Sequence, residues 1–289
     1  MRLSSSIGTL CKQFTCEESI EMMYRAGFDA LDFSFFDERF YGEDTENESC
    51  QDYFRKLRTI AEEKGMRFNQ AHAPFASSFA DEAQTKKRFD EIVRSMRLAS
   101  LLGIETTVVH PVQHLRYLDE GVPEKLFEMN MEFYKRLIPY CEEYNIKVAL
   151  ENMWQAPYNG KINHSTCSKP EEFIRYLDEL NSEWFVACLD IGHASLVCED
   201  PANFIRKLGC KRLKALHVHD VDGFKDSHTL PYYGIVDWDS VAGALKDIGY
   251  TGDFTLEAGN FLNAIPKEVW GSGLDHMAKV SRHIMGKIV

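Results

Sequence analysis

The sequence predicts an α/β protein that forms a single (β/α)8 TIM barrel, and three observations carry this prediction. Helix-like stretches and short β-rich runs alternate along all 289 residues. The β-rich runs are apolar on both faces, which is typical of strands in a parallel sheet. Eight such runs are present, and eight βα units close most naturally into a barrel. We therefore expect one domain over residues 1–289.

The predicted strands mostly begin just after a residue that ends a helix. They lie near residues 2–7, 28–33, 66–72, 104–110, 146–151, 184–190, 213–219 and 253–257. Glycine is favoured just past a helix end because it adopts the left-handed conformation without a Cβ penalty. The residues predicted in that role are Gly27, Gly65, Gly103, Asn145, Gly209 and Gly249.

Helical periodicity fills the segments between the strands. In residues 81–103 the apolar side chains follow i, i+3, i+4 spacing, and Asp81 is the expected N-cap. Residues 123–144 behave likewise, with Pro123 at the helix start and a kink expected at Pro139. The longest irregular piece, residues 34–48, is expected to be a loop that acts as a lid.

A doubly wound open sheet is the alternative architecture. Such a sheet usually has a glycine-rich phosphate loop after its first strand. The segment SSSIGTLCKQF, which runs from the first predicted strand into the residues after it, has no G-x-G-x-x-G pattern. This absence favours the barrel.

Composition restricts the class of protein. A formal net charge of −12 disfavours non-specific nucleic-acid binding. Eight cysteines are scattered without a C-x-x-C pair, and MRLSSSIGTL has no apolar signal core. Both features predict a cytoplasmic protein with reduced thiols. No apolar run is long enough to span a membrane, so no membrane partner is expected.

Histidine or carboxylate side chains end six consecutive predicted strands. Closure of the barrel brings the carboxyl ends of its strands to one mouth. The residues at the strand ends are, in chain order, His72, His110, Glu151, Asp190, His217 and His219 on one strand, and Glu257. Three more residues lie in the loops that follow: His193 after Asp190, and Asp226 and His228 after His219. Each alone is commonly a hydrogen-bonded or solvated residue, but together these carboxylates would repel one another. A divalent cation removes the repulsion, so the pattern predicts a metal site.

The donor types narrow the choice of metal and ligands. Two Glu, one Asp and one His form a mixed oxygen and nitrogen set that suits Mn²⁺, Co²⁺, Zn²⁺ or Mg²⁺. His217 and His219 share one face of the predicted strand. Because His219 is nearer the predicted strand end, we expect it to be the ligand and His217 to be packed behind it. Cys188 is expected to fill the barrel interior.

The ordered motifs ALEN, LDIGH, LHVHD, DSHTLPYYGIVDW and GYTGDFTLEA resemble the xylose isomerase-like barrel superfamily. That group includes sugar phosphate isomerases/epimerases, ketose 3-epimerases, inosose dehydratases and apurinic-site endonucleases. The resemblance spans the chain from AHAP to the last strand. It implies one divalent metal held by Glu151, Asp190, His219 and Glu257. It also implies that both glutamates act as acid/base catalysts on opposite faces of a sugar, with His193 contacting the substrate.

The endonuclease branch of that superfamily implies additional metal ligands. His72 and His110 match one further metal site, and His193, Asp226 and His228 match another. The spacing between His219 and Asp226 is shorter than in that branch. The acidic loop FFDERFYGEDTENE also disfavours nucleic acid as a partner, since a DNA-binding surface needs basic residues.

The expected function is that of a metal-dependent sugar isomerase or epimerase that works through an enediolate. Removal of an α proton needs a polarised carbonyl and a nearby base, and epimerisation needs one group on each face of the carbon. Trp154, Phe75 and the loop SFFDERFY are expected to wall the pocket, and Lys225 is a further candidate for substrate contact. No glycine nest marks a phosphate site, which favours an unphosphorylated sugar, keto-sugar or polyol.

Alternatives to this function stay open. A keto-sugar or inosose dehydratase begins with the same proton abstraction but expels a β-leaving group. A non-catalytic metal-binding or sugar-binding module would need no pair of opposed bases. Acidic barrels of this size often form dimers or tetramers, so a homo-oligomer is also expected.

Overall fold

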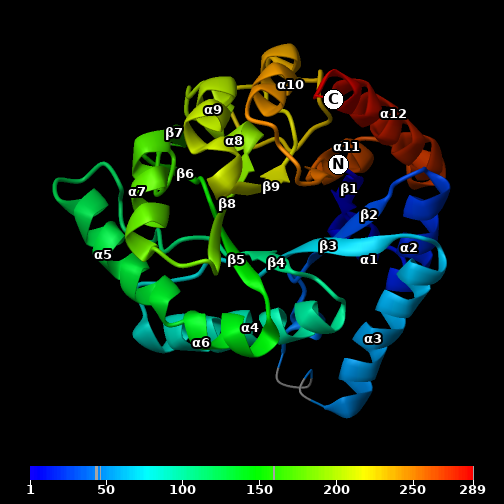
Figure 1. Ribbon diagram of the computed structural model, residues 1–289, viewed down its shortest axis with the longest axis horizontal. Helices are drawn as coiled ribbons and strands as arrows, with labels where there is room; N and C mark the ends of the chain where they lie inside the picture. The colour runs from blue at the N-terminus through cyan, green and yellow to red at the C-terminus, as the bar shows by residue number, and fades with distance from the viewer. Residues whose placement is uncertain (43–44, 46, 159, 289) are drawn as a thin grey trace.

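Eight parallel strands form the barrel in the computed structural model, which describes residues 1–42, 45, 47–158 and 160–288 (Figure 1). They follow the order β10-β1-β2-β3-β4-β5-β8-β9, and a parallel bridge between Val218 and Leu256 links the two ends. The predicted (β/α)8 barrel is therefore confirmed. The strands are β1 (Leu3–Ser6), β2 (Ala30–Ser34), β3 (Arg67–His72), β4 (Thr106–Val108), β5 (Lys147–Glu151), β8 (Phe185–Asp190), β9 (Leu213–His217) and β10 (Phe254–Leu256).

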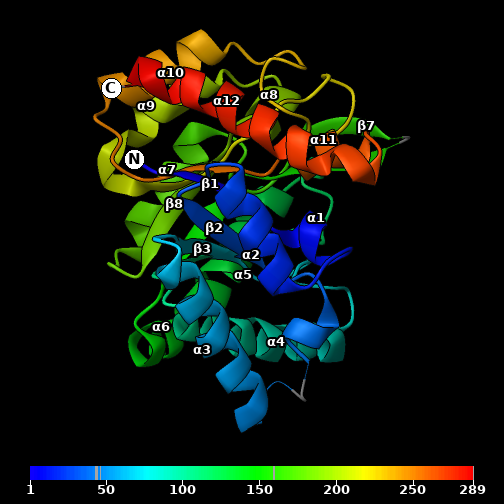
Figure 2. The ribbon, with the colours of Figure 1, turned by 90° about the vertical axis from the view of Figure 1, so that its right-hand side faces the viewer.

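Helices surround the strands on the outside (Figures 1 and 2). No helix in the described ranges is long and apolar enough to cross a membrane. The helices are α1 (Gly8–Cys11), α2 (Cys16–Arg25), α3 (Glu48–Glu63), α4 (Glu82–Leu101), α5 (Val122–Lys135), α6 (Ile138–Tyr144), α7 (Pro170–Leu180), α8 (Ile191–Leu196), α9 (Pro201–Arg212), α10 (Trp238–Asp247), α11 (Gly259–Asn263) and α12 (Trp270–Ile288), with 3-10 turns at Glu38–Phe40 and Lys267–Val269.

The local signals in the sequence account for most helix boundaries. Asp81 accepts a hydrogen bond from the Gln84 amide and caps α4, and Pro123 lies in the first turn of α5. The kink expected at Pro139 is a break between α5 and α6. All six predicted helix-ending residues have positive φ, including Asn145 at 50°.

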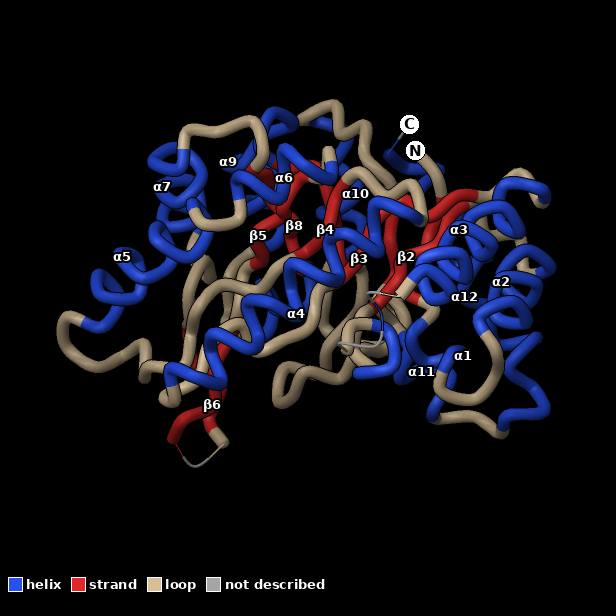
Figure 3. The backbone as a smooth tube through the Cα atoms, turned by 90° about the horizontal axis from the view of Figure 1, so that it is seen from below, coloured by secondary structure: helices blue, strands red, loops and turns tan. Residues whose placement is uncertain are grey.

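An antiparallel hairpin follows β5, and the sequence did not predict it. It consists of β6 (Trp154–Tyr158) and β7 (Lys161–His164). It projects from the barrel at the lower left of Figure 3, where β6 is labelled. The Gln155 amide donates to the carbonyls of Gln113 and Leu115 at 2.6 and 2.8 Å. The Tyr117 amide donates to Gln155 Oε1 at 3.0 Å. These bonds attach the hairpin to the loop after β4.

Apolar side chains fill both the barrel and the layer outside it. Inside, Cys188 packs with Val108, Ala149, Val186 and Ala215, which confirms its expected place. Outside, Phe35 is fully buried against Phe33 and Phe54, so it belongs to the core and not to a lid. The predicted lid includes residues 43–44 and 46, which lie outside the described residues, and the lid stays a prediction.

The first testable prediction concerns Glu172, which lies on α7. Burial raises its pKa from 4.5 to about 7, although the Tyr117 hydroxyl donates to Glu172 Oε2 at 3.0 Å. The folded protein therefore holds a proton that the unfolded chain releases above pH 4.5. The stability linked to this proton is present below pH 4.5 and is lost as the pH rises through about 7.

Glu172→Gln removes the buried charge and keeps an acceptor for Tyr117. We expect the variant to match the wild type near pH 4.5 and to exceed its free energy of unfolding by up to about 3 kcal/mol near pH 8. Urea unfolding of both proteins at the two pH values measures this difference. A difference that does not change with pH would contradict the prediction.

Candidate metal centre

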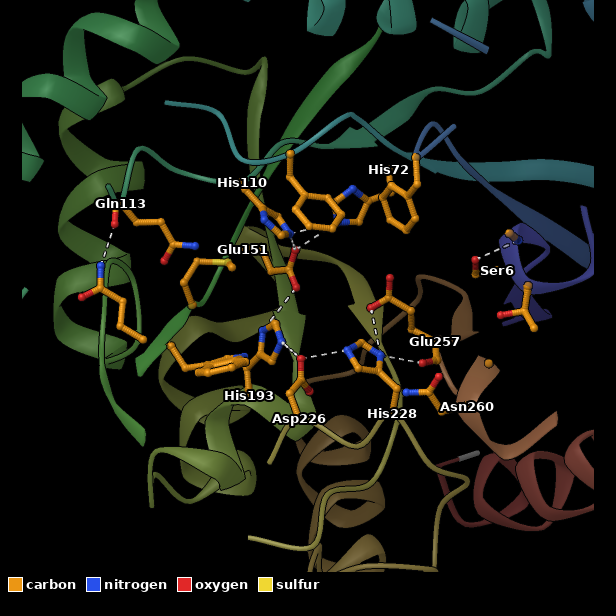
Figure 4. A pocket seen from close by; sticks show the side chains of 18 of the residues that line it. Ser6, His72, His110, Gln113, Glu151, His193, Asp226, His228, Glu257 and Asn260 are labelled. Atoms are coloured by element: carbon orange, nitrogen blue, oxygen red, sulfur yellow. Dashed lines mark hydrogen bonds and ion pairs between the residues drawn. The ribbon is translucent and has the colours of Figure 1, made fainter. Parts of the chain in front are cut away.

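A cavity of about 610 Å³ lies at the carboxyl ends of the strands (Figure 4). Most of the residues predicted at the site line it. Asp190, His217 and His219 lie buried beside it, each with 1% of its surface or less exposed. The predicted residues that line the cavity are His72, Phe75, His110, Glu151, Trp154, His193, Asp226, His228 and Glu257.

Three carboxylates converge on one imidazole nitrogen at the floor of the cavity. His217 Nδ1 lies 3.1 Å from Glu151 Oε1, 3.3 Å from Glu257 Oε2 and 3.9 Å from Asp190 Oδ2. One donor atom from each of these four residues lies within 4.8 Å of the other three. We call this set the central group. Its members come from the ends of β5, β8 and β9 and from the residue after β10.

In the described part of the chain, no lysine or arginine pairs with the carboxylates of the central group. Among the described residues, only histidines form ion pairs with Glu151, Asp190 and Glu257. Burial would raise the pKa of Glu151, but His217 and His110 hold that pKa well below its usual range. Three crowded carboxylates and a nitrogen donor form a set that fits a divalent cation.

That His219 is a metal ligand stays a prediction, but the histidine within the central group is His217. The reason is the end of the strand: β9 stops at His217, which is paired in register with Asp190 on β8. His219 lies two residues beyond, where its Nε2 contacts Asp190 Oδ2 at 3.0 Å. Gly192 leaves room for this ring, since a Cβ there would lie 2.1 Å from His219 Cε1.

His219 belongs to a second set with His193, Asp226 and His228, whose donor atoms also lie within 4.8 Å of one another. Asp226 Oδ2 lies 2.9 Å from His228 Nε2 and 3.3 Å from His193 Nε2. Burial lowers the pKa of His228, but the hydrogen bond with Asp226 has the opposite effect and the net pKa is about 9. The Asp190 and Asp226 carboxylates likewise hold the pKa of buried His193 well above its usual range.

A third set joins His72 and His110 to Glu151. His110 Nε2 lies 3.0 Å from both Glu151 Oε2 and His72 Nε2. The other ring nitrogen of His72 donates to the Ala73 carbonyl at 2.8 Å, because a carbonyl oxygen only accepts. Burial lowers the pKa of His110. His72 and His110, which the resemblance assigns to one further metal site, therefore lie next to each other in the structure.

Several lining residues were not identified from the sequence. They include Lys12, Gln113 and Met153, whereas Phe36, whose ring lies 4.7 Å from that of His72, belongs to the loop that was expected to wall the pocket. Asn152 also escaped prediction: its side chain exchanges two hydrogen bonds with the Asp190 backbone, at 2.7 and 2.8 Å. Its position directly after Glu151 in the motif ALEN is the sequence feature from which a role beside the cavity could have been predicted. Lys225 lies outside the main cavity, in an adjoining one that shares Asp226 and Asn260.

Known proteins resemble the chain along most of its length. The model of a family described as xylose isomerase-like TIM barrel matches residues 20–280. Fructoselysine 3-epimerase of Escherichia coli O157:H7 is 25% identical over 184 residues, which cover 64% of this chain and 63% of that protein. The first two curated relatives, both uncharacterised, are matched over 65% and 49% of their own length.

Solved structures share the fold. A D-tagatose 3-epimerase-like protein is 23% identical with a TM-score of 0.76, and the match covers 99% of each chain. The IOLI protein, whose structure has a binding zinc atom, is 18% identical with a TM-score of 0.76. That match covers 100% of this chain and 98% of the other. At such identities the similarity establishes the fold.

Proposed function

The chain belongs to the xylose isomerase-like TIM barrel family, and from this premise we propose that it is a divalent-metal-dependent sugar isomerase or epimerase. The central group is the observation that supports the proposal. Two of its carboxylates, Glu151 and Glu257, line the cavity, while Asp190 and His217 lie buried behind them. The resemblance to sugar 3-epimerases adds independent support. Because these two carboxylates line the cavity, they can contact a substrate as well as hold an ion.

The geometry of Glu151 and Glu257 suits proton transfer at a carbon next to a carbonyl. A cation held by the central group would polarise the carbonyl and stabilise the enediolate. Glu151 comes from the end of β5 and Glu257 from beyond β10, so the two carboxylates approach the cavity from different strands. One removes the proton and the other returns it on the opposite face, which inverts the carbon. Their metal would be Mn²⁺, Co²⁺, Zn²⁺ or Mg²⁺.

His193 and the aromatic side chains position the substrate in this proposal. Asn152 O accepts a hydrogen bond from His193 Nδ1 at 3.0 Å, which orients the ring toward the cavity. A protonated His193 donates to a substrate oxygen on which negative charge develops. Trp154, Phe36 and Phe75 line the cavity and offer apolar surfaces to the C–H groups of a sugar.

Solvent exchange tests the proposed function. We expect the Mn²⁺- or Co²⁺-loaded protein in D₂O to introduce deuterium next to the carbonyl of a ketose, followed by NMR. Epimers as products would identify an epimerase, and loss of a β-leaving group would identify the dehydratase alternative. The control is the same protein after chelation of the metal. Full metal occupancy without exchange in any ketose or keto-inositol would contradict the proposal.

Phosphodiester hydrolysis is the second candidate, because the second and third donor sets lie beside the central group. They contain His72 and His110 on one side, and His193, Asp226 and His228 on the other. The net charge of −12 disfavours a nucleic-acid substrate. Metal analysis of the purified protein distinguishes the two functions: about one ion per chain supports the isomerase, and about three support the hydrolase.

A further inference from the structure

The two ends of the cavity differ in charge. One end, which we call the hairpin end, is lined by the uncharged side chains of Gln113, Met153, Trp154, Gln155 and Ala156. The other, which we call the α1 end, is lined by Ser6, Gly8, Thr9, Lys12, Gly259 and Asn260. In Figure 4, Gln113 and Ser6 lie on opposite sides of Glu151, His193 and Glu257. A substrate at the central group can therefore extend toward either end.

Lys12 is the only lysine or arginine among the described residues that line this cavity. Lys12 is exposed, and within that part of the chain its ammonium has no hydrogen-bond or ion-pair partner. The lining carboxylates, Glu151, Asp226 and Glu257, belong to the donor sets at the centre, and Glu257, two residues before Gly259, is the one nearest in sequence to the α1 end. The ammonium is therefore available to an anion that enters the cavity.

The remaining groups at the α1 end suit an anion as well. Thr9 Oγ1 also lacks a hydrogen-bond partner among the described residues, so its hydroxyl can donate to a ligand. Gly259 holds α11 against this hydroxyl, since a Cβ at that position would lie 2.2 Å from Thr9 Oγ1. The α1 end thus combines an ammonium and a hydroxyl donor, the types of group that bind phosphate and carboxylate oxygens.

We propose that the substrate carries an anionic group, a phosphate or a carboxylate, and that Lys12 binds this group at the α1 end. The proposal rests on the proposed function and names the substrate class for it. It reverses the expectation of an unphosphorylated sugar, which was based on the lack of a glycine nest. Lys12 is brought to the cavity only by the folded chain.

Binding of inorganic phosphate to the Mn²⁺-loaded protein tests the site directly. Isothermal titration calorimetry is expected to show that Lys12→Ala weakens phosphate binding about tenfold or more, whereas Lys12→Arg largely retains it. Lys86→Ala removes an exposed lysine from α4, outside the cavity, and serves as the matched control. Absence of phosphate binding to the wild type, or equal binding to Lys12→Ala, would overturn the proposal.

Solvent exchange provides the second measurement, with a neutral ketose, its terminal phosphate and the corresponding keto-uronate compared side by side. We expect Lys12→Ala to lower kcat/KM for the preferred anionic ketose about tenfold more than for the neutral one, chiefly through KM. The phosphate and carboxylate arms identify the anion. Exchange of all three with equal losses in the variant would reject the anion site and leave the isomerase. Lys12-dependent phosphate binding without exchange of any ketose would support the anion site and reject the proposed isomerase.

Discussion

Replacing Glu151 by glutamine is expected to lower the rate of solvent exchange by about a thousandfold or more. Glutamine preserves the shape of the side chain but cannot accept a proton at neutral pH, and loss of a general base typically costs about 10² to 10⁴ in rate. The same change removes one of the three carboxylates of the central group. Exchange kinetics by NMR at saturating Mn²⁺ measure the loss.

The control for this variant is Glu142→Gln, an exposed residue on α6 that is remote from the cavity. We expect it to exchange at the wild-type rate. Equal melting temperatures of the two variants would show that the fold is intact. If Glu151→Gln still binds Mn²⁺ but no longer promotes exchange, a non-catalytic binding module is excluded. Retention of more than a tenth of the wild-type rate would show that Glu151 is not the base.

His217→Gln is expected to weaken Mn²⁺ binding by about a hundredfold or more, and His219→Gln by about tenfold. The difference follows from position. His217 Nδ1 lies within 3.3 Å of oxygens of both Glu151 and Glu257, whereas His219 Nε2 contacts Asp190. Both imidazoles are almost completely buried, so the substitutions are similar in size and burial. Each therefore serves as the matched control for the other.

Titration of Mn²⁺, followed by its electron paramagnetic resonance signal, gives both affinities. Circular dichroism of the metal-free variants checks that each protein is folded before metal is added. A greater loss in His219→Gln than in His217→Gln would restore the ligand set expected from the sequence. Equal losses would indicate that a single ion does not occupy the central group alone.

The sequence by itself determined the number, order and approximate bounds of the barrel strands. These features depend on local interactions: apolar periodicity, N-caps such as Asp81, and residues with positive φ such as Gly103 and Asn145. The sequence also placed Glu151, Asp190 and Glu257 at strand ends. Because barrel closure brings the carboxyl ends of the strands to one face, these three carboxylates could be predicted to meet.

Only the tertiary structure decided which histidine joins those carboxylates. The pairing of β8 with β9 puts His217 opposite Asp190, and a strand end that is wrong by two residues selects His219 instead. The β6–β7 hairpin is held by contacts of Gln155 with a distant loop, and Lys12 lines the cavity from the position directly after the four-residue helix α1. Contacts between residues far apart in the chain leave no periodic pattern, so the sequence alone did not reveal them.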